Sequence, residues 1–185
     1  ISGNTFYKLS LQEAEVSYIE PAFNVSSGFT LNILNNKTED STQLSGRFYG
    51  VKMNTNAVAG TNVHLTGNNF SRIKTAGNTF LIFDQLKSGL NNSPNRRVLN
   101  NNFSRINASN GMLSGIWVEY TGSTSASNID SFVNNTIKEL TTTNGDISGI
   151  TINKNTNSSS GVVITQNEIS YLSSSGLNSN AIGIS

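Results

Sequence analysis

Two acidic residues hold equivalent places in the similar segments FLIFDQ and SGIWVEY, and their side chains have the clearest potential for chemistry. These residues, Asp84 and Glu119, are 119 − 84 = 35 positions apart. If the two segments are strands stacked on one another, their backbones lie about 5 Å apart. Paired carboxylates catalyse glycoside hydrolysis, or bind Ca²⁺ when further oxygen ligands join them. The pair has no third carboxylate and no basic neighbour beyond Lys52, so an incidental surface pair is the alternative.

The only tryptophan, Trp117, is expected on the outer surface beside Ile82. Exposed aromatic rings stack on sugar rings, so Trp117 is a candidate for contact with a carbohydrate. The alternative is that the stretch 84–97 folds over both side chains and buries them. Tyr120 and Tyr49 carry the same ambiguity between contact with a ligand and burial.

Two arginines, Arg72 and Arg105, occupy the same place in two copies of the segment FSRI. Adjacent like charges could hold an anionic glycan or a carboxylate, and a solvated face of mixed charge is the alternative. His64 is the single histidine, and it alternates with Val63 and Leu65, so we expect it to face outward. With no cysteine and no second histidine, we expect no metal site and no cofactor.

The elements that must position these residues follow from an internal repeat. A nine-residue pattern, apolar-x-x-Asn-x-(Phe/Ile)-x-x-(Leu/Ile), recurs along the whole chain at intervals of 32 to 34 residues. A period of this length, held throughout, is typical of a solenoid. The copies begin at Ile1, Ile33, Leu65, Val98, Phe132 and Ile164, and the second copy is degenerate.

Short alternating apolar runs indicate strands rather than helices in every repeat. Gly, Asn and Ser interrupt each potential helix, whereas YGVKMN, SGITIN and GVVIT alternate with a period of two. We therefore predict two or three strands per repeat, stacked in parallel and in register as about six coils of a β-helix. The segments INASNGMLSG, LTTTNGDISG and LSSSGLNSNAIG are expected to form long polar loops along one side.

Aligning the Gly-Ile strands predicts which side chains face outward, with Leu81 and Phe83 facing the interior. One outward column contains Lys52, Ile82, Trp117 and Thr151, and the next contains Asn54, Asp84, Glu119 and Asn153. The candidate ligand contacts are Trp117, Tyr120, Lys52, Arg72 and Arg105.

The asparagine of the repeat predicts a ladder. Amide side chains that stack at the inter-strand spacing of about 4.8 Å can hydrogen-bond along the column. Asparagine also tolerates the left-handed backbone conformation that a sharp corner requires. The predicted ladder contains Asn36, Asn68, Asn101, Asn135 and Asn167.

The succession of SGITIN and GVVITQNEI resembles right-handed parallel β-helix proteins of the pectin-lyase-like superfamily, of the bacterial secreted or surface type. The resemblance covers the chain as one domain, residues 1–185, and is best over 63–185. It implies an all-β, right-handed parallel β-helix related to polysaccharide lyases, glycoside hydrolases, tailspikes and adhesins. Enzymes of the superfamily carry acidic clusters on adjacent strands, a pattern that Asp84 and Glu119 match only in part.

Composition limits the functional classes. The net charge is +1 and 12% of residues are charged, about half the usual fraction, so nothing predicts binding of nucleic acid. No apolar run approaches the roughly 18 residues of a membrane span. We expect an extracellular or bacterial cell-surface segment of a longer solenoid, without the caps that protect solenoid edges. It would act as a stalk or adhesin-like surface for glycans or another surface protein. The alternative is a polysaccharide lyase or glycoside hydrolase.

Overall fold

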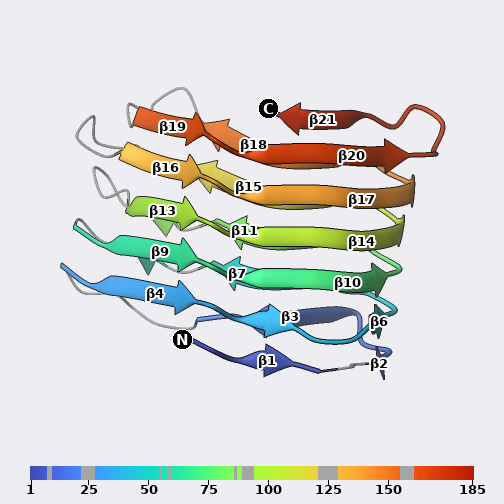
Figure 1. The fold of residues 1–185 in the computed structure, drawn as a ribbon, viewed down its shortest axis with the longest axis horizontal. Helices are drawn as coiled ribbons and strands as arrows, with labels where there is room; N and C mark the ends of the chain where they lie inside the picture. The colour runs from blue at the N-terminus through green and yellow to red at the C-terminus, as the bar shows by residue number, and fades with distance from the viewer. Residues whose placement is uncertain are drawn as a thin grey trace.

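The fold consists of strands that stack in parallel, coil upon coil (Figure 1). The computed structural model describes residues 1–7, 10–21, 28–54, 56–57, 60–85, 87–88, 94–120, 129–154 and 161–185. This part of the chain contains β-strands and no helix. The strands of successive coils pair in parallel, so the predicted parallel β-solenoid is confirmed.

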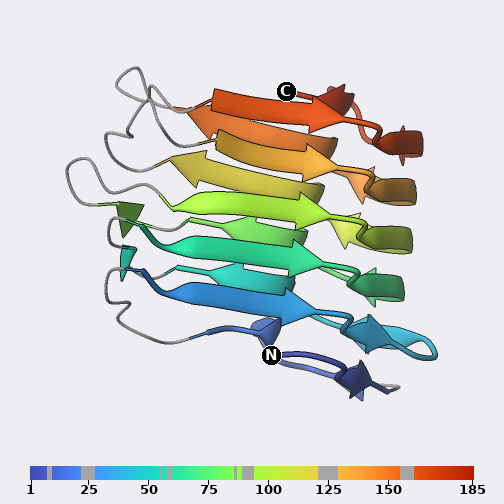
Figure 2. The ribbon, with the colours of Figure 1, turned by 60° about the vertical axis from the view of Figure 1, so that its left-hand side comes forward.

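Three sheets form the walls of the solenoid, and a turn passes through sheet A, sheet B and sheet C in that order (Figure 2). Sheet A contains β4 (Thr30–Leu34), β9 (Asn62–Thr66), β13 (Asn95–Leu99), β16 (Ile129–Val133) and β19 (Gly161–Thr165). Sheet B contains β1 (Thr5–Phe6), β2 (Ser10–Leu11), β5 (Lys37–Thr38), β6 (Thr42–Leu44), β10 (Asn69–Thr75), β14 (Asn102–Asn110), β17 (Thr136–Asn144) and β20 (Glu168–Ser174). Sheet C contains β3 (Glu15–Ile19), β7 (Arg47–Met53), β11 (Thr79–Asp84), β15 (Leu113–Tyr120), β18 (Ile147–Lys154) and β21 (Ala181–Ile184). A separate two-stranded sheet pairs β8 (Asn56–Ala57) with β12 (Lys87–Ser88).

The solenoid has about four regular turns, so the prediction of six coils is wrong. Within the described residues, four turns have an unbroken strand in each sheet, from β9, β10 and β11 to β19, β20 and β21. In the N-terminal windings the sheet B strand is split, into β1 and β2 and then into β5 and β6. The second split follows Thr38 and includes Ser41, polar residues that replace the apolar residues of the repeat.

Stacked apolar columns fill the interior. Each fully buried aliphatic or aromatic side chain stabilises the fold by about 2 kcal/mol relative to an exposed one. The fully buried columns include Ile33, Leu65, Val98 and Phe132 in sheet A, Phe70, Phe103 and Ile137 in sheet B, and Val51, Ile82, Ile116 and Ile150 in sheet C. The apolar alternation along each strand therefore becomes a set of vertical stripes.

The register of β11 differs by one residue from the predicted register. Ile82 pairs with Ile116 and is fully buried, so it faces the interior rather than the solvent. Phe83 pairs with Trp117 and takes the outward place. Asp84, predicted to face outward, takes the next inward place and is only 1% exposed. The predicted orientations of all three residues in β11 are therefore wrong.

The shift in register occurs at a column that glycine occupies in the neighbouring coils. Gly115 has no room for a side chain, because a Cβ there would lie 2.7 Å from the carbonyl oxygen of Gly149 and 2.8 Å from Cγ2 of Ile137. In β11 this column is occupied by Leu81, and both Leu81 and Ile82 are fully buried in the core. Two consecutive residues thus face inward, which strict alternation does not allow.

Two of the three predicted long loops are strands with tight turns instead. The segment INASNGMLSG lies in β14 and β15, and LTTTNGDISG lies in β17 and β18. The turns between these strands contain Gly111, with φ of 98°, and Gly145, with φ of 140°. These backbone conformations favour glycine, because other residues rarely adopt them. Only the third segment includes a longer connection, residues 175–180, between β20 and β21.

A continuous asparagine ladder runs along the corner between sheets A and B. The backbone N and Nδ2 of Asn68 each donate to Oδ1 of Asn101 at 2.9 Å, and Nδ2 also donates to the carbonyl of Ile33 at 3.0 Å. The same pattern continues to Asn167, so the predicted ladder is confirmed. Asn4 adds a further rung, because its Nδ2 donates to Oδ1 of Asn36 at 2.8 Å.

Two columns of residues with positive φ turn the chain at fixed places. Asn35, Gly67, Asn100, Asn134 and Gln166 precede the ladder asparagines. Asp40, Arg72, Arg105, Glu139 and Tyr171 form a second column in sheet B, with φ between 54° and 65°. Glycine and asparagine tolerate this conformation, whereas other residues pay about 1–2 kcal/mol. The second column therefore keeps long side chains at a conformational cost.

Substitution of Asn101 by alanine should lower the free energy of unfolding by at least about 3 kcal/mol, because several buried partners lose their hydrogen bonds. These partners include the backbone N of Asn68 and the carbonyl of Leu65. Urea denaturation measures the effect, with Asn69→Ala, at an exposed position in the next residue column, as the control. Equal losses in the two variants would contradict a structural role for the ladder.

The second column of positive φ predicts opposite effects for two substitutions of Arg72. Arg72→Val should destabilise the fold by about 1–2 kcal/mol, because a β-branched residue resists the left-handed conformation. Arg72→Asn removes the same charge but tolerates that conformation, so it should be neutral or slightly stabilising. Thermal and urea unfolding of both variants compare them directly. A valine variant as stable as the asparagine variant would contradict the assignment of strain to this column.

Candidate functional site

Four side chains form a polar cluster inside the solenoid, which we call the buried charge cluster. Asp84 ends β11, Arg96 lies in β13, Tyr120 ends β15 and Asp130 lies in β16. None of them is more than 3% exposed. Nε of Arg96 donates to Oδ2 of Asp84 at 2.7 Å, and Nη1 donates to Oδ2 of Asp130 at 3.1 Å. The hydroxyl of Tyr120 donates to the same oxygen of Asp130.

The buried charge cluster interrupts an apolar column of sheet A. Arg96 is aligned with Val63 of the coil below, and Asp130 is aligned with Val162 of the coil above. The backbone N of Arg96 donates to Oδ1 of Asp130 at 2.7 Å, and its guanidinium lies 4.9 Å from the centre of the Tyr120 ring. The cluster thereby connects the end of sheet C with the start of sheet A in successive coils.

Burial and neighbouring charges shift the pKa values of Asp130 and Arg96 in opposite directions. Burial raises the pKa of Asp130, and the guanidinium of Arg96 and the hydroxyl of Tyr120 lower it without cancelling that effect. Burial alone would lower the pKa of Arg96, but Asp84 and Asp130 outweigh it and raise that pKa. Two carboxylates face one guanidinium away from water, an arrangement that is stable only when every partner is present.

The expected surface pair of Asp84 and Glu119 is therefore wrong, because the wall of the solenoid separates the two carboxylates. Asp84 faces inward, and Arg96 donates to both of its oxygens, at 2.7 Å and 3.3 Å. Glu119 faces outward, where Oε2 accepts a hydrogen bond from Nε2 of Gln85 at 2.8 Å. Tyr120, a candidate ligand contact, is buried at 3% exposure and belongs to the cluster.

Sequence reasoning missed Arg96 and Asp130. A signal was present, because each lies two positions before an apolar residue of the repeat, Val98 or Phe132, and therefore has inward parity. Charged residues at such positions are normally assigned to the surface, since unpaired charges are almost never fully buried. Only the pairing with Asp84 across the interior makes their burial possible.

An aromatic patch lies on the outer side of sheet C and consists of Tyr49, Phe80, Phe83 and Trp117. The ring centres of Phe80 and Phe83 are 5.0 Å apart, those of Tyr49 and Phe80 5.5 Å, and those of Phe80 and Trp117 5.9 Å. Tyr49 and Phe80 are buried, whereas Phe83 and Trp117 are half-buried. Nε1 of Trp117 is buried without a hydrogen-bond partner among the described residues.

Lys52 borders the aromatic patch and faces outward as expected. Its ammonium lies 5.0 Å from the centre of the Tyr49 ring, pairs with Glu20 at 3.3 Å and also pairs with Glu15. Burial tends to lower the pKa of Lys52, but the two glutamates raise it above its ordinary value. Part of the stretch 84–97, namely residue 86 and residues 89–93, lies outside the described residues, so the expected cover over Trp117 remains an expectation.

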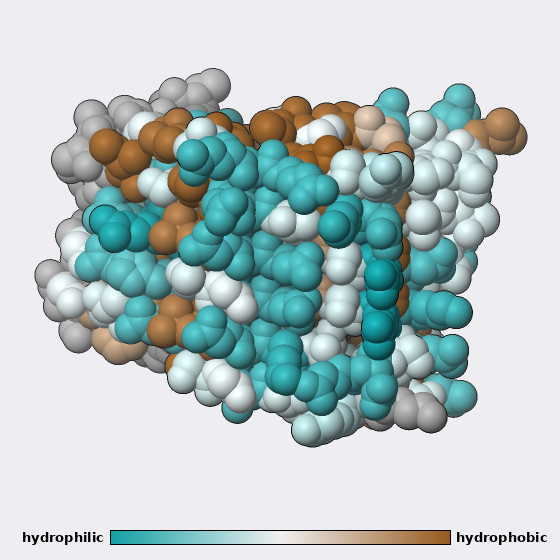
Figure 3. All heavy atoms as spheres, viewed as in Figure 1, coloured by the Kyte–Doolittle hydropathy of each residue, from teal (hydrophilic) through white to brown (hydrophobic). Residues whose placement is uncertain are grey.

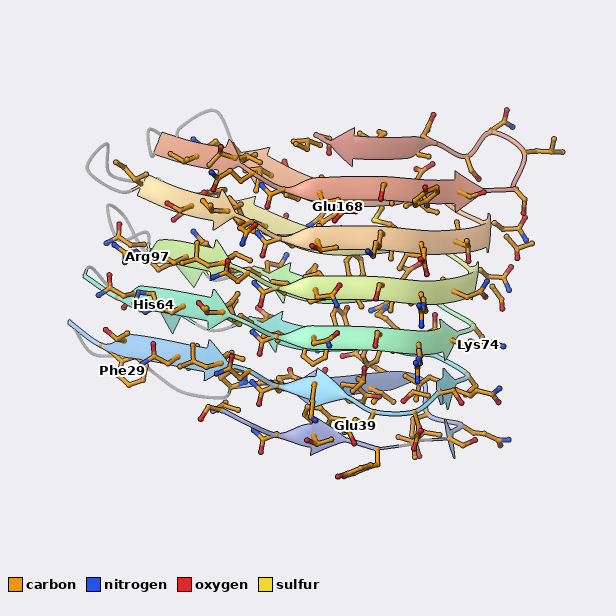
Figure 4. All side chains as sticks on the ribbon, in the orientation of Figure 1. Phe29, Glu39, His64, Lys74, Arg97 and Glu168 are labelled. Carbon is orange, nitrogen blue, oxygen red and sulfur yellow. The ribbon has the colours of Figure 1, made fainter. Side chains whose placement is uncertain are left out.

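The remaining candidates lie apart from the aromatic patch, on sheets A and B. Arg72 and Arg105 are exposed in sheet B, and Nε of Arg105 is 3.2 Å from Oε2 of Glu139. In sheet A, Figure 4 labels His64 and Arg97, which are paired in register on β9 and β13. Partial burial and the charge of Arg97 lower the pKa of His64. None of these side chains converges with another candidate on a shared cleft within the described residues.

The fold defines the class of this chain as a parallel β-solenoid with an internal asparagine ladder. No model of a known protein family matches the chain, and comparisons with curated proteins and with solved structures give no significant match. Over the described residues there is no helix long and apolar enough to cross a membrane. The same residues contain no group of three or more His, Cys, Asp or Glu side chains suited to a metal ion.

Replacement of Asp130 by asparagine should change how stability depends on pH. Because the folded state raises the pKa of Asp130, the stability from this carboxyl is complete below its unfolded pKa and is lost as the pH rises through the folded value. Asp130→Asn removes this pH-dependent contribution. The free energy of unfolding of the variant should therefore fall less than that of the unmodified chain between acid and neutral pH. Urea midpoints across that range test this, with Glu168→Gln at the surface as the control. A common slope in all three proteins would contradict the raised pKa.

Proposed function

We propose that this chain is an extracellular or bacterial cell-surface β-solenoid that serves as a rigid stalk and presents an adhesive surface to glycans or another surface protein. The observation that carries the proposal is that the buried charges and the polar surface lie in different places. The ionic cluster is closed inside, while the face formed by sheets A and B is mostly hydrophilic (Figure 3). Such a molecule presents surface without a catalytic cleft in the described part.

Rigidity follows from the way the coils are joined. Each buried ladder asparagine bonds to the coil on either side, as Asn101 does with the carbonyl of Leu65 and with Oδ1 of Asn135. Buried, fully satisfied networks restrict motion more than surface contacts do. A column held in this way along its corner supports the role of a stalk.

The non-enzymatic proposal has better support than a polysaccharide lyase or glycoside hydrolase. A catalytic carboxylate must reach the substrate, directly or through one water molecule. Asp84 is 1% exposed and bound on both oxygens by Arg96, and Glu119 has no second carboxylate beside it in its register column. Membership of the pectin-lyase-like superfamily is part of the same proposal, on the strength of the repeat pattern and the parallel coils.

The aromatic patch is the proposed contact for a glycan. Phe83 and Trp117 are its accessible members, and Lys52 provides a cation at its border. A half-buried ring that is fixed by neighbouring rings can stack on the apolar face of a sugar with little loss of side-chain entropy. Arg72 and Arg105 provide a separate and weaker candidate, because they are exposed and Arg105 is already paired with Glu139.

Trp117→Ala should abolish binding to any glycan that the chain recognises on a glycan array, because it removes the largest accessible ring. Thr151→Ala is the matched control, since Thr151 occupies the same outward column on the next coil. The control should bind as the unmodified chain does, and circular dichroism should be unchanged in both variants. Binding that survives Trp117→Ala would rule out the aromatic patch as the glycan contact. An array without any signal would leave only the proposed role as a stalk.

A further inference from the structure

We infer that the outer face of sheet A carries a binding site for a sulfate or phosphate group, formed by His64 and Arg97. The two residues lie on β9 and β13, in central coils of the solenoid, and they are direct partners in the parallel register. Figure 4 labels both on these neighbouring strands. The aromatic patch lies on sheet C, so this site is independent of the proposed glycan contact.

Arg97 supplies a positive charge that no carboxylate of the described residues neutralises. Its side chain is exposed, and among those residues its guanidinium forms no ion pair. Arg105 differs, because it is paired with Glu139. A guanidinium presents its N–H donors in a planar fork that fits two oxygens of one anionic group. Arg97 can therefore bind an anion without first giving up an acidic partner.

The surroundings of Arg97 on sheet A favour an anion as well. Strands β4, β9, β13 and β16 alternate between buried and accessible residues. Apart from His64 and Arg97, their outward residues are asparagine, threonine, serine and aliphatic side chains. The acidic residue of these four strands, Asp130, faces inward and bonds with Arg96. An anion that approaches this face therefore meets a positive potential without competition from carboxylates of the same strands.

The imidazole of His64 is oriented so that one of its nitrogens remains for a ligand. Nδ1 of His64 lies 3.1 Å from Oδ1 of Asn32, on the coil below. An amide oxygen can only accept a hydrogen bond, so Nδ1 carries the proton, and Nε2 is bare in the neutral ring. Protonation turns Nε2 into a second donor, on a ring that is now positively charged beside Arg97.

The coil above adds a hydroxyl to the same column. Ser131 of β16 is aligned with Arg97 and is half-buried on the outward side. An amide, an imidazole, a guanidinium and a hydroxyl thus follow one another on four successive coils, about 4.8 Å apart. Arg97 can bind two oxygens of an anion while His64 binds a third. A group of the sulfate or phosphate class, with at least three free oxygens, therefore uses both residues, whereas a carboxylate has only two oxygens.

Anion binding at this site is coupled to the protonation of His64. Partial burial and the charge of Arg97 lower the pKa of His64 below its ordinary value. Among the described residues, Arg97 is the one charged group that faces this ring from β4, β9 or β13. A bound anion offsets the charge of Arg97 and accepts a hydrogen bond from the protonated Nε2, so it should raise the pKa of His64. By linkage, affinity for the anion should increase as the pH falls through that pKa.

The nuclear magnetic resonance signal of the His64 ring tests the site directly, because His64 is the single histidine of the chain. Its pKa is measured in sodium sulfate and in sodium chloride at equal ionic strength. Sulfate is the cleaner probe, since phosphate changes its own charge near pH 6 to 7. Sulfate should raise the pKa of His64 relative to chloride. The rise should correspond to an affinity about two- to fivefold higher for the protonated ring, the range of exposed charge pairs.

Arg97→Gln should abolish the difference between sulfate and chloride, although it raises the pKa of His64 in chloride by removing a neighbouring positive charge. Lys74→Gln removes the same charge from an exposed position on sheet B and should keep the difference. Circular dichroism checks that both variants are folded. The same pKa in both salts for the unmodified chain, or an undiminished effect of sulfate in Arg97→Gln, would overturn the inference.

A second measurement distinguishes the two sources of the anionic group. Heparin carries sulfate on a polysaccharide, whereas inorganic sulfate presents the group alone. Once the effect of sulfate on His64 is established, retention on immobilised heparin is compared for the unmodified chain, Arg97→Gln and Lys74→Gln. Retention that is lost only in Arg97→Gln identifies sulfate on a polymer as the ligand. Equal retention of all three proteins identifies the free ion.

Discussion

The alignment of one coil over the next depends on the buried amide of the repeat. An asparagine without access to water must satisfy its donors and its acceptor within the protein, and the only groups within reach belong to the coils on either side. Asn68 meets this requirement through Ile33 below and Asn101 above, with distances of 2.9 to 3.0 Å. Such short distances allow little vertical or lateral slip. The apolar stripes and the outward columns then follow, because every other residue lies at a fixed offset from this corner.

The buried charge cluster depends on the same alignment of coils, and it distinguishes one coil from its neighbours. Stripes of similar aliphatic residues fit one another in several ways, so they do not distinguish one coil from its neighbours. Arg96 fits only where Asp84 lies across the interior and Asp130 lies on the coil above. A cluster of this kind contributes specificity more than stability, since an apolar replacement of similar volume is often equally stable. The central coils thereby differ from the others in what they can stack against.

Much of the architecture could be predicted because the same pattern of residue types recurs in each copy of the repeat. The period, the parallel pairing and the ladder depend on local residue types that recur, and the structure contains all three. The orientation of Asp84 could not be derived, because it depends on Leu81 occupying a position that glycine occupies in the neighbouring coils. The roles of Arg96 and Asp130 were hidden for a similar reason, since a buried charge makes sense only once its partners on other coils are known. The number of regular turns was overestimated because a degenerate copy keeps its spacing after it has lost its apolar residues.

The spacing of the ladder bonds also bears on how the chain acquires its shape. The side-chain bonds of the ladder that link one coil to another join residues 32 to 37 positions apart, which is about one coil. The entropy of loop closure is therefore nearly the same for every coil, and no step must wait for a distant part of the chain. Once two coils are in place, each neighbouring coil can add to a finished template. Folding can therefore propagate from one coil to the next, and whole repeats can be gained or lost without a new folding problem.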